Sequence, residues 1–104
     1  MGSKAIKIKS KDRGVMMVEQ EVIIMNKLGL HTRPAKDLVH LATSFHSDIT
    51  LYKENKKANA KSFINLISLS APFGTVLKLT VSGNDEETAL YAISNLIFNR
   101  FGED

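Results

Sequence analysis

The sequence predicts an α+β fold in which helices cover one face of an antiparallel sheet. Three observations lead to this prediction. Segments of alternating or β-branched apolar residues, typical of strands, are interspersed with segments whose apolar residues recur every three or four positions, typical of helices. Their order along the chain is β-α-β-β-α-β-α. The length of 104 residues suits a single domain with one modest core.

The first strand and the first helix are predicted between residues 18 and 45. Residues 18–25 (VEQEVIIM) have the apolar, β-branched composition of a strand. After a connection at residues 26–29, Pro34 suits the first turn of a helix, because the N–H group that proline lacks has no intrahelical partner there. The residues that follow predict an amphipathic helix with this inward face: Ala35, Leu38, Val39, Ala42 and Phe45.

The middle of the chain predicts a hairpin and a short helix. Residues 48–54 (DITLYKE) alternate as a strand does, and residues 57–60 are expected to return as a second, shorter strand. Asn55 is expected to supply the positive φ of the tight turn between them. Ser62 then opens a dense apolar stretch that ends before Pro72, which favours a short helix.

The last strand and the last helix complete the predicted order. Residues 75–82 (TVLKLTVS) alternate as a half-buried strand does. Residues 83–87 (GNDEE) form a turn into a helix, with an Asn or Asp cap and acidic residues in the first turn. The predicted inward stripe of this helix is Ala89, Leu90, Ile93, Leu96, Ile97 and Phe101.

The formal net charge of +3 is unevenly distributed. Residues 1–16 carry five basic side chains and one acidic side chain, whereas residues 17–104 carry a net charge of −1. We therefore expect residues 1–16 to be a flexible basic N-terminal arm or leader, and residues 17–104 to be the folded domain. A nearly neutral domain argues against a nucleic-acid-binding surface spread over the fold, so no nucleic-acid partner is expected.

Composition excludes several further classes. The chain has no cysteine, which excludes disulfides, thiolate chemistry and cysteine-ligated zinc sites and suits a reducing cytosol. No apolar run is long enough to cross a bilayer, so membrane insertion is not expected. Hydrophobic residues make up 43% of the chain and charged residues 24%, a balance that excludes disorder of the whole chain.

The segment Gly29-Leu30-His31-Thr32-Arg33-Pro34-Ala35 is the candidate site. His31 falls at or next to the cap of the first helix, where unpaired N–H groups and the positive end of the helix dipole favour an anion. Arg33 adds a guanidinium group suited to phosphate oxygens. The same field disfavours imidazolium, so we expect a neutral, nucleophilic imidazole.

These residues describe a histidine that accepts a phosphoryl group and holds it. The segment contains no pair of carboxylates, no set of metal ligands and no glycine-rich phosphate loop. It therefore does not predict an enzyme that turns over a substrate by itself, and neither a cofactor nor a metal is expected.

Residues 17–104 resemble the HPr family, the histidine-containing phosphocarriers of the bacterial phosphoenolpyruvate:sugar phosphotransferase system. The resemblance rests on the His31 segment and on Ala60-Lys61-Ser62, Ser68-Leu69, Gly74 and Gly83-Asn84-Asp85-Glu86. It implies an open-faced β-sandwich of four antiparallel strands with three helices packed on one face. It also implies that His31 accepts phosphate on Nδ1 from enzyme I and passes it to sugar-specific enzyme IIA proteins, with Arg33 meeting the phosphoryl group. A cytoplasmic monomer is expected.

Ser62 matches the family's regulatory serine, which an HPr kinase/phosphorylase phosphorylates in many bacteria. The residues themselves predict a second role, since a serine hydroxyl at a helix start caps a free N–H group. Both roles can hold at once. The short helix is so apolar that we expect Phe63, Ile64 and Ile67 to be partly exposed as a docking patch for partners.

The chain departs from the family pattern at several positions. Asn55 stands where members often have a glycine, and Ser70 follows Leu69 where glycine is frequent. Lysines that ring the active site in some members are replaced by His40, Thr43 and Asn65. These replacements bear on the electrostatic part of partner docking.

Three other functions share parts of this pattern. A carrier in a nitrogen-related phosphotransfer chain fits the same residues. A regulatory paralogue that signals through Ser62 fits less well, because such a protein lacks a usable histidine and this chain has His31 and Arg33. A small RNA-binding module fits the element order, but Tyr52 is its only candidate aromatic residue on the middle strands.

Overall fold

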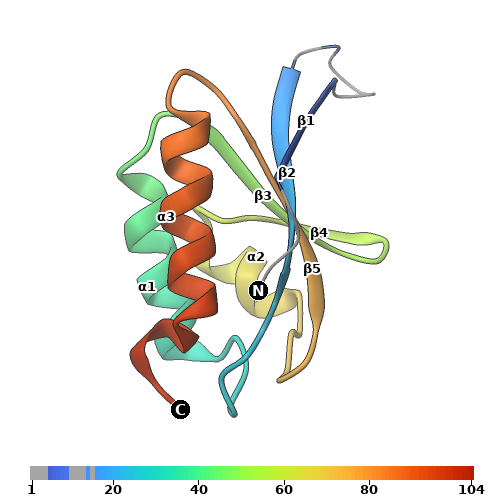
Figure 1. Ribbon diagram of the computed structural model, residues 1–104. Coiled ribbons are helices and arrows are strands. Elements are labelled where there is room, and N and C mark those ends of the chain that lie inside the picture. Colours follow the sequence, from blue (N-terminus) through green and yellow to red (C-terminus); the bar gives the residue numbers. More distant parts are fainter. Residues whose placement is uncertain (1–4, 10–13, 15) are drawn as a thin grey trace.

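A single open sheet carries three helices on one of its faces, which confirms the predicted fold class (Figure 1). The computed structural model describes residues 5–9, 14 and 16–104. Neighbouring strands are antiparallel, in the spatial order β1-β2-β5-β3-β4. The strands are β1 (Ile6–Lys9), β2 (Met16–Ile23), β3 (Asp48–Lys53), β4 (Lys56–Asn59) and β5 (Val76–Ser82). The helices are α1 (Thr32–Thr43), α2 (Phe63–Ser68) and α3 (Glu86–Phe98), followed by a 3₁₀ turn at Arg100–Gly102.

The core lies between the sheet and the helices. Alternate residues of the three central strands are buried there, as the period of two requires: Val18 and Val22, Ile49 and Leu51, and Leu77, Leu79 and Val81. The helices bury one stripe each against them, including Leu38, Leu66, Ile93 and Ile97. The opposite face of the sheet carries no helix (Figure 1).

The sheet has five strands where the resemblance implied four. The additional strand, β1, falls within the segment that was expected to be a flexible arm, and it pairs with β2 from Ile6↔Glu19 to Lys9↔Met16. Its alternation of Ile and Lys is the period of an edge strand, but four residues are too few to predict one. Lys7 Nζ donates to Glu86 Oε2 at 2.7 Å, which ties β1 to the start of α3. The rest of the predicted arm, residues 1–4, 10–13 and 15, lies outside the described residues.

Two local predictions were wrong. The positive φ of the β3–β4 turn belongs to Glu54, at 54°, and not to Asn55. The last helix ends at Phe98, so Phe101 is buried but does not belong to it. Arg100, Phe101 and Gly102 all have positive φ, at 58°, 54° and 73°, and this left-handed turn changes the course of the chain after the helix. We call residues 99–104 the C-terminal turn.

Candidate functional site

The loop between β2 and α1 places His31 at the N-cap of α1. Gly29 has a φ of 70°, and a Cβ at this position would lie 2.6 Å from the carbonyl oxygen of Ala71. The next N–H group, that of Leu30, donates to the same oxygen at 2.8 Å. Glycine is needed because two backbone segments meet here, and the contact fixes the loop against the segment that follows α2.

His31 and Arg33 bind the same carboxylate. His31 Nε2 lies 2.8 Å from Glu103 Oε1, and Arg33 Nη1 donates to Glu103 Oε2 at 2.8 Å. The side chains of His31 and Arg33 remain 35% and 57% exposed, whereas that of Glu103 is 16% exposed. Within the described residues, His31 makes no side-chain capping hydrogen bond. The C-terminal turn therefore covers the Nε2 edge of the imidazole, while part of the side chain stays exposed.

Asn26 connects this carboxylate to the loop. The side chain is fully buried, and its Nδ2 donates to Gly29 O at 2.6 Å and to Glu103 Oε1 at 2.8 Å. Asn26 Oδ1 has no hydrogen-bond partner among the described residues. The hydrogen bond from His31 lowers the pKa of Glu103 most, and that from Asn26 adds to the effect. Glu103 is thus held as an anion.

Asn26 and Glu103 were not predicted from the sequence. Glu103 is 77 residues from Asn26 and 72 from His31, so no motif spacing links them. Gly102, which follows the last helical pattern, is the one sequence signal of a turn at this place.

Ser62 lies at the N-cap of α2, where its Oγ accepts from the N–H group of Asn65 at 3.3 Å. The predicted cap is therefore confirmed. In the same helix, Ile64 and Ile67 are 68% and 38% exposed, while Phe63 packs partly against the core. Two of the three residues of the predicted docking patch thus face outward on a helix that packs against α1.

His40, Thr43 and Asn65 occupy the positions where the resemblance placed lysines. His40 is exposed in the last turn of α1, and its carbonyl oxygen accepts from Thr43 Oγ1 at 3.0 Å. Asn65 Oδ1 accepts from the N–H group of Asn59 at 3.1 Å. The side chains of Thr43 and Asn65 thus form hydrogen bonds with the backbone.

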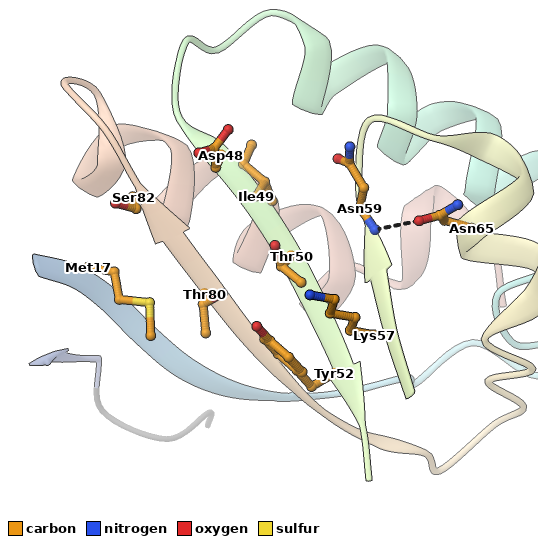
Figure 2. Close-up of a pocket in the computed structure, with 10 residues that line it drawn as sticks. All are labelled: Met17, Asp48, Ile49, Thr50, Tyr52, Lys57, Asn59, Asn65, Thr80 and Ser82. Carbon is orange, nitrogen blue, oxygen red and sulfur yellow. Dashed lines mark hydrogen bonds between the residues drawn. The ribbon is translucent and has the colours of Figure 1, made fainter. Parts of the chain in front are cut away.

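One cavity lies away from His31. It is a hollow of about 540 Å³ on the sheet face without helices, and it includes Thr50, Tyr52 and Thr80 (Figure 2). The polar side chains in it come from β3, β4, β5 and α2. Among the described residues, no three His, Cys, Asp or Glu side chains are close enough to hold a metal ion. No helix in the described part of the chain has the length and hydropathy to span a membrane.

A protein-family model and several known proteins match most of this chain. The family model described as "PTS HPr component phosphorylation site" matches residues 18–99, so β1 lies outside the match. The phosphocarrier protein HPr of Xylella fastidiosa (strain 9a5c) is 44% identical over 88 residues, covering 85% of this chain and 99% of that protein. The phosphocarrier protein NPr of Shewanella violacea is 41% identical over 86 residues, covering 83% and 94%.

A solved structure supports the same match. The crystal structure of HPr-C-His from Thermoanaerobacter tengcongensis has a TM-score of 0.80 with this chain at 46% sequence identity. The match covers 83% of this chain and 97% of that one.

Proposed function

Because this chain belongs to the HPr family of phosphocarriers, we propose that it accepts a phosphoryl group on His31 from enzyme I and passes it to sugar-specific enzyme IIA proteins. The observation that carries the proposal is the position of His31. Its imidazole lies at the start of a twelve-residue helix, beside an arginine and partly exposed to an incoming donor.

The start of α1 can bind the negative charge of the phosphoryl group. The N–H groups of Thr32 and Arg33 precede the first intrahelical hydrogen bond, which the N–H group of Ala35 makes with His31 O at 2.9 Å. Unpaired N–H groups and the helix dipole favour a phosphoryl dianion. The Arg33 guanidinium can move from Glu103 to the phosphoryl oxygens, because more than half of the side chain is in solvent.

The site supports a carrier and not an enzyme that acts alone. His31 supplies a nucleophile and Arg33 a positive charge, and the carboxylate that contacts the imidazole, Glu103, binds its Nε2 edge. A phosphoryl group on His31 would therefore stay bound until a partner protein supplies an acceptor group.

Docking in this proposal uses the exposed face of α2. Ile64 and Ile67 offer apolar area that a partner can bury, and Ser62 lies at the start of the same helix. Phosphorylation of Ser62, for example by an HPr kinase/phosphorylase, would place a hydrated dianion beside this patch. It would act on docking and leave His31 chemically intact.

A second candidate is a carrier in a nitrogen-related phosphotransfer chain. The observation in its favour is the 41% identity to an NPr protein. The two candidates share His31 and differ in the enzyme I that donates the phosphate. Phosphate acceptance from a sugar-branch enzyme I, compared with that from a nitrogen-branch enzyme I, separates them.

His31→Ala is expected to abolish phosphoryl acceptance and to leave the fold intact, because the ring is 35% exposed and contributes no core packing. The protein is incubated with phosphoenolpyruvate and enzyme I, and its intact mass is measured. The parent should gain one acid-labile, base-stable phosphoryl group. His40→Ala, on the exposed face of the same helix, should gain it as the parent does. Acid-labile phosphate on the His31→Ala variant would show that another histidine is the acceptor.

A further inference from the structure

Glu103 is the most highly connected polar side chain near His31. Its carboxylate receives hydrogen bonds from Asn26, His31 and Arg33, each at 2.8 Å, although it lies beyond the last helix. The phosphocarrier function proposed above uses His31 and Arg33 but assigns Glu103 no part. Asn26 is equally unassigned, although it is fully buried.

The contact with Glu103 decides which ring nitrogen of His31 carries the hydrogen. An ionised carboxylate can only accept hydrogen bonds. At 2.8 Å from Glu103 Oε1, Nε2 must therefore be the donor. In a neutral imidazole the other nitrogen, Nδ1, then holds a lone pair. Nδ1 is the ring nitrogen that Glu103 does not bind, and the His31 side chain is 35% exposed, which allows a phosphoryl donor to approach the ring.

Asn26 determines where the carboxylate lies. Its Nδ2 bridges Gly29 O and Glu103 Oε1, so rotating the amide by 180° would place its oxygen against two acceptors. The amide orientation is thus fixed by its surroundings. The backbone adds a second connection, since the N–H group of Lys27 donates to Asp104 O at 2.7 Å. The left-handed turn at Arg100–Gly102 brings Glu103 back to this point.

We propose that Glu103, held in place by Asn26, is a positioning residue that orients His31 with Nδ1 as the acceptor and balances the charge that the ring gains; this proposal rests on the phosphocarrier function. In the transfer step, the Nδ1 lone pair forms the new bond to phosphorus. The bond between phosphorus and the donor breaks, and its electron pair stays with the donor. The hydrogen remains on Nε2, so the phosphorylated ring carries a positive charge next to the Glu103 carboxylate, which is not protonated.

Before transfer, the Glu103 carboxylate is also the hydrogen-bond partner of Arg33. The hydrogen bond to Oε2 holds the guanidinium beside His31. When the phosphoryl group arrives, Arg33 exchanges one anion for the other, while Oε1 keeps its bonds to His31 and Asn26. Arg33 is thus kept close to the reacting atoms at all times.

The first test needs no phosphoryl transfer. In the unphosphorylated protein, the ¹H–¹⁵N spectrum of the His31 ring should show an Nε2–H signal that exchanges slowly with water. In Glu103→Ala this signal should exchange at least tenfold faster, because its acceptor is gone. Asp104→Asn removes the same charge from the neighbouring, exposed residue and should leave the signal unchanged. Equal exchange rates in the parent and Glu103→Ala would overturn the proposal.

The second test measures reactivity with potassium phosphoramidate, a small donor that needs no docking. Glu103→Ala should accept phosphate about 10- to 100-fold more slowly than the parent, the loss expected for a hydrogen bond to a charged group. Glu103→Gln keeps an acceptor oxygen without the charge and should fall between them. Asn26→Ala should slow acceptance less than Glu103→Ala. Asp104→Asn should react as the parent does.

The outcomes separate this proposal from the phosphocarrier function. If the parent accepts phosphate from enzyme I and Glu103→Ala reacts equally fast with phosphoramidate, the function holds and the positioning role fails. If phosphoramidate phosphorylates His31 in a Glu103-dependent way but enzyme I does not, the positioning role holds and the carrier function fails. Because Asn26 is buried, its variant is first checked for a cooperative thermal transition; if it does not fold, the Glu103 variants decide.

Discussion

Arg33 is an exposed side chain that is nevertheless bound to a carboxylate. More than half of its surface is in solvent, yet its guanidinium is bonded to Glu103 beside His31. An exposed ion pair of this kind contributes little to stability. The ion pair instead fixes the position of Arg33, because it keeps a positive charge next to the nucleophile.

Arg33→Ala is expected to slow phosphoryl acceptance from enzyme I without abolishing it, since the positive charge stabilises the phosphoryl group during transfer. A loss of roughly tenfold to a hundredfold suits a residue that is partly screened by water. Rapid-quench kinetics measure it. Lys36→Ala removes a charge from an exposed position on the same helix and is the matched control. Transfer by Arg33→Ala at the rate of the Lys36 variant would reduce Arg33 to a surface charge.

At the residue scale, the sequence predicted the part of the site that is local. His31 and Arg33 belong to one seven-residue segment whose helix start could be recognised from Pro34. Asn26 and Glu103 could not be found in this way, because their roles depend on a turn with three successive positive φ values. Two of those residues, Arg100 and Phe101, are not glycine, and their side chains do not predict a left-handed conformation.

At the element scale, α2 combines a cap, a core residue and an exposed apolar face within six residues. Ser62 accepts from the N–H group of Asn65, Leu66 is buried, and Ile64 points outward. A helix this short depends on its cap and its packing, because isolated helices of such length are not stable. Changes at Ser62 can therefore act on stability, on docking, or on both.

Two substitutions at Ser62 separate these effects. Ser62→Ala removes the cap and should lower the free energy of unfolding by about 0.5–1 kcal/mol, the lower part of the usual range, because the hydrogen bond is long. It should accept phosphate normally. Ser62→Asp keeps a capping oxygen and should retain a thermal midpoint close to that of the parent. It should accept phosphate from enzyme I more slowly through weaker association, because a charge must be desolvated at the patch.

Urea unfolding and transfer kinetics at several enzyme I concentrations measure both effects. Equal transfer rates for Ser62→Asp and the parent at every salt concentration would leave Ser62 as a cap alone. A loss of transfer in Ser62→Ala as large as that in Ser62→Asp would assign the effect to helix instability.

Elements with a clear period of hydrophobic residues could be predicted from the sequence. Elements that depend on contacts with other parts of the chain could not. The strands at 76–82 and 48–53 and the helix at 32–43 follow the expected alternation and spacing. β1 has only two apolar residues, Ile6 and Ile8, and it exists through its pairing with β2 and the Lys7–Glu86 ion pair. The β3–β4 turn shows the same limit, since the side chain most tolerant of positive φ, Asn55, is not the one that adopts it.

At the scale of the whole molecule, Asp85 joins two distant parts of the chain. Its Oδ1 accepts from the N–H group of Ser47 at 3.0 Å and from Ser47 Oγ at 2.6 Å, and its Oδ2 accepts from the N–H group of His46 at 2.9 Å. These contacts hold the start of α3 against the start of β3. The hydrogen bond from the Ser47 hydroxyl, followed by that from the His46 backbone, lowers the pKa of Asp85 to about 2.

This lowered pKa predicts a loss of stability in acid. The pKa of Asp85 is lower in the folded protein than its ordinary value of 3.8, so the unfolded chain binds a proton first as the pH falls. The contribution of Asp85 is present above pH 4 and is lost between about 4 and 2. The pKa values of Glu86 and Glu103 are also lowered, which adds to the same trend.

Thermal midpoints measured from pH 6 to pH 2 check this prediction. The midpoint of the parent should fall through this range, and that of Asp85→Asn should start lower and fall less steeply. Asp37→Asn, on α1, is the control and should run parallel to the parent. Parallel curves for the parent and Asp85→Asn would show that Asp85 does not link folding to pH.

The C-terminal turn gives the site its own local opening equilibrium. Phe101 anchors the C-terminal turn in the core, whereas Glu103 and Asp104 beyond it are held by the bond from Lys27 N–H to Asp104 O, by the bond from Glu103 N–H to Arg100 O, and by the Glu103 side chain. Segments with so few buried contacts open at a small fraction of the free energy of global unfolding. Fraying of Glu103 and Asp104 would release His31 and Arg33 from the carboxylate together, while Phe101 and the sheet stay in place. Native-state hydrogen exchange at the Lys27 and Glu103 amides would therefore report how often the imidazole is without its carboxylate.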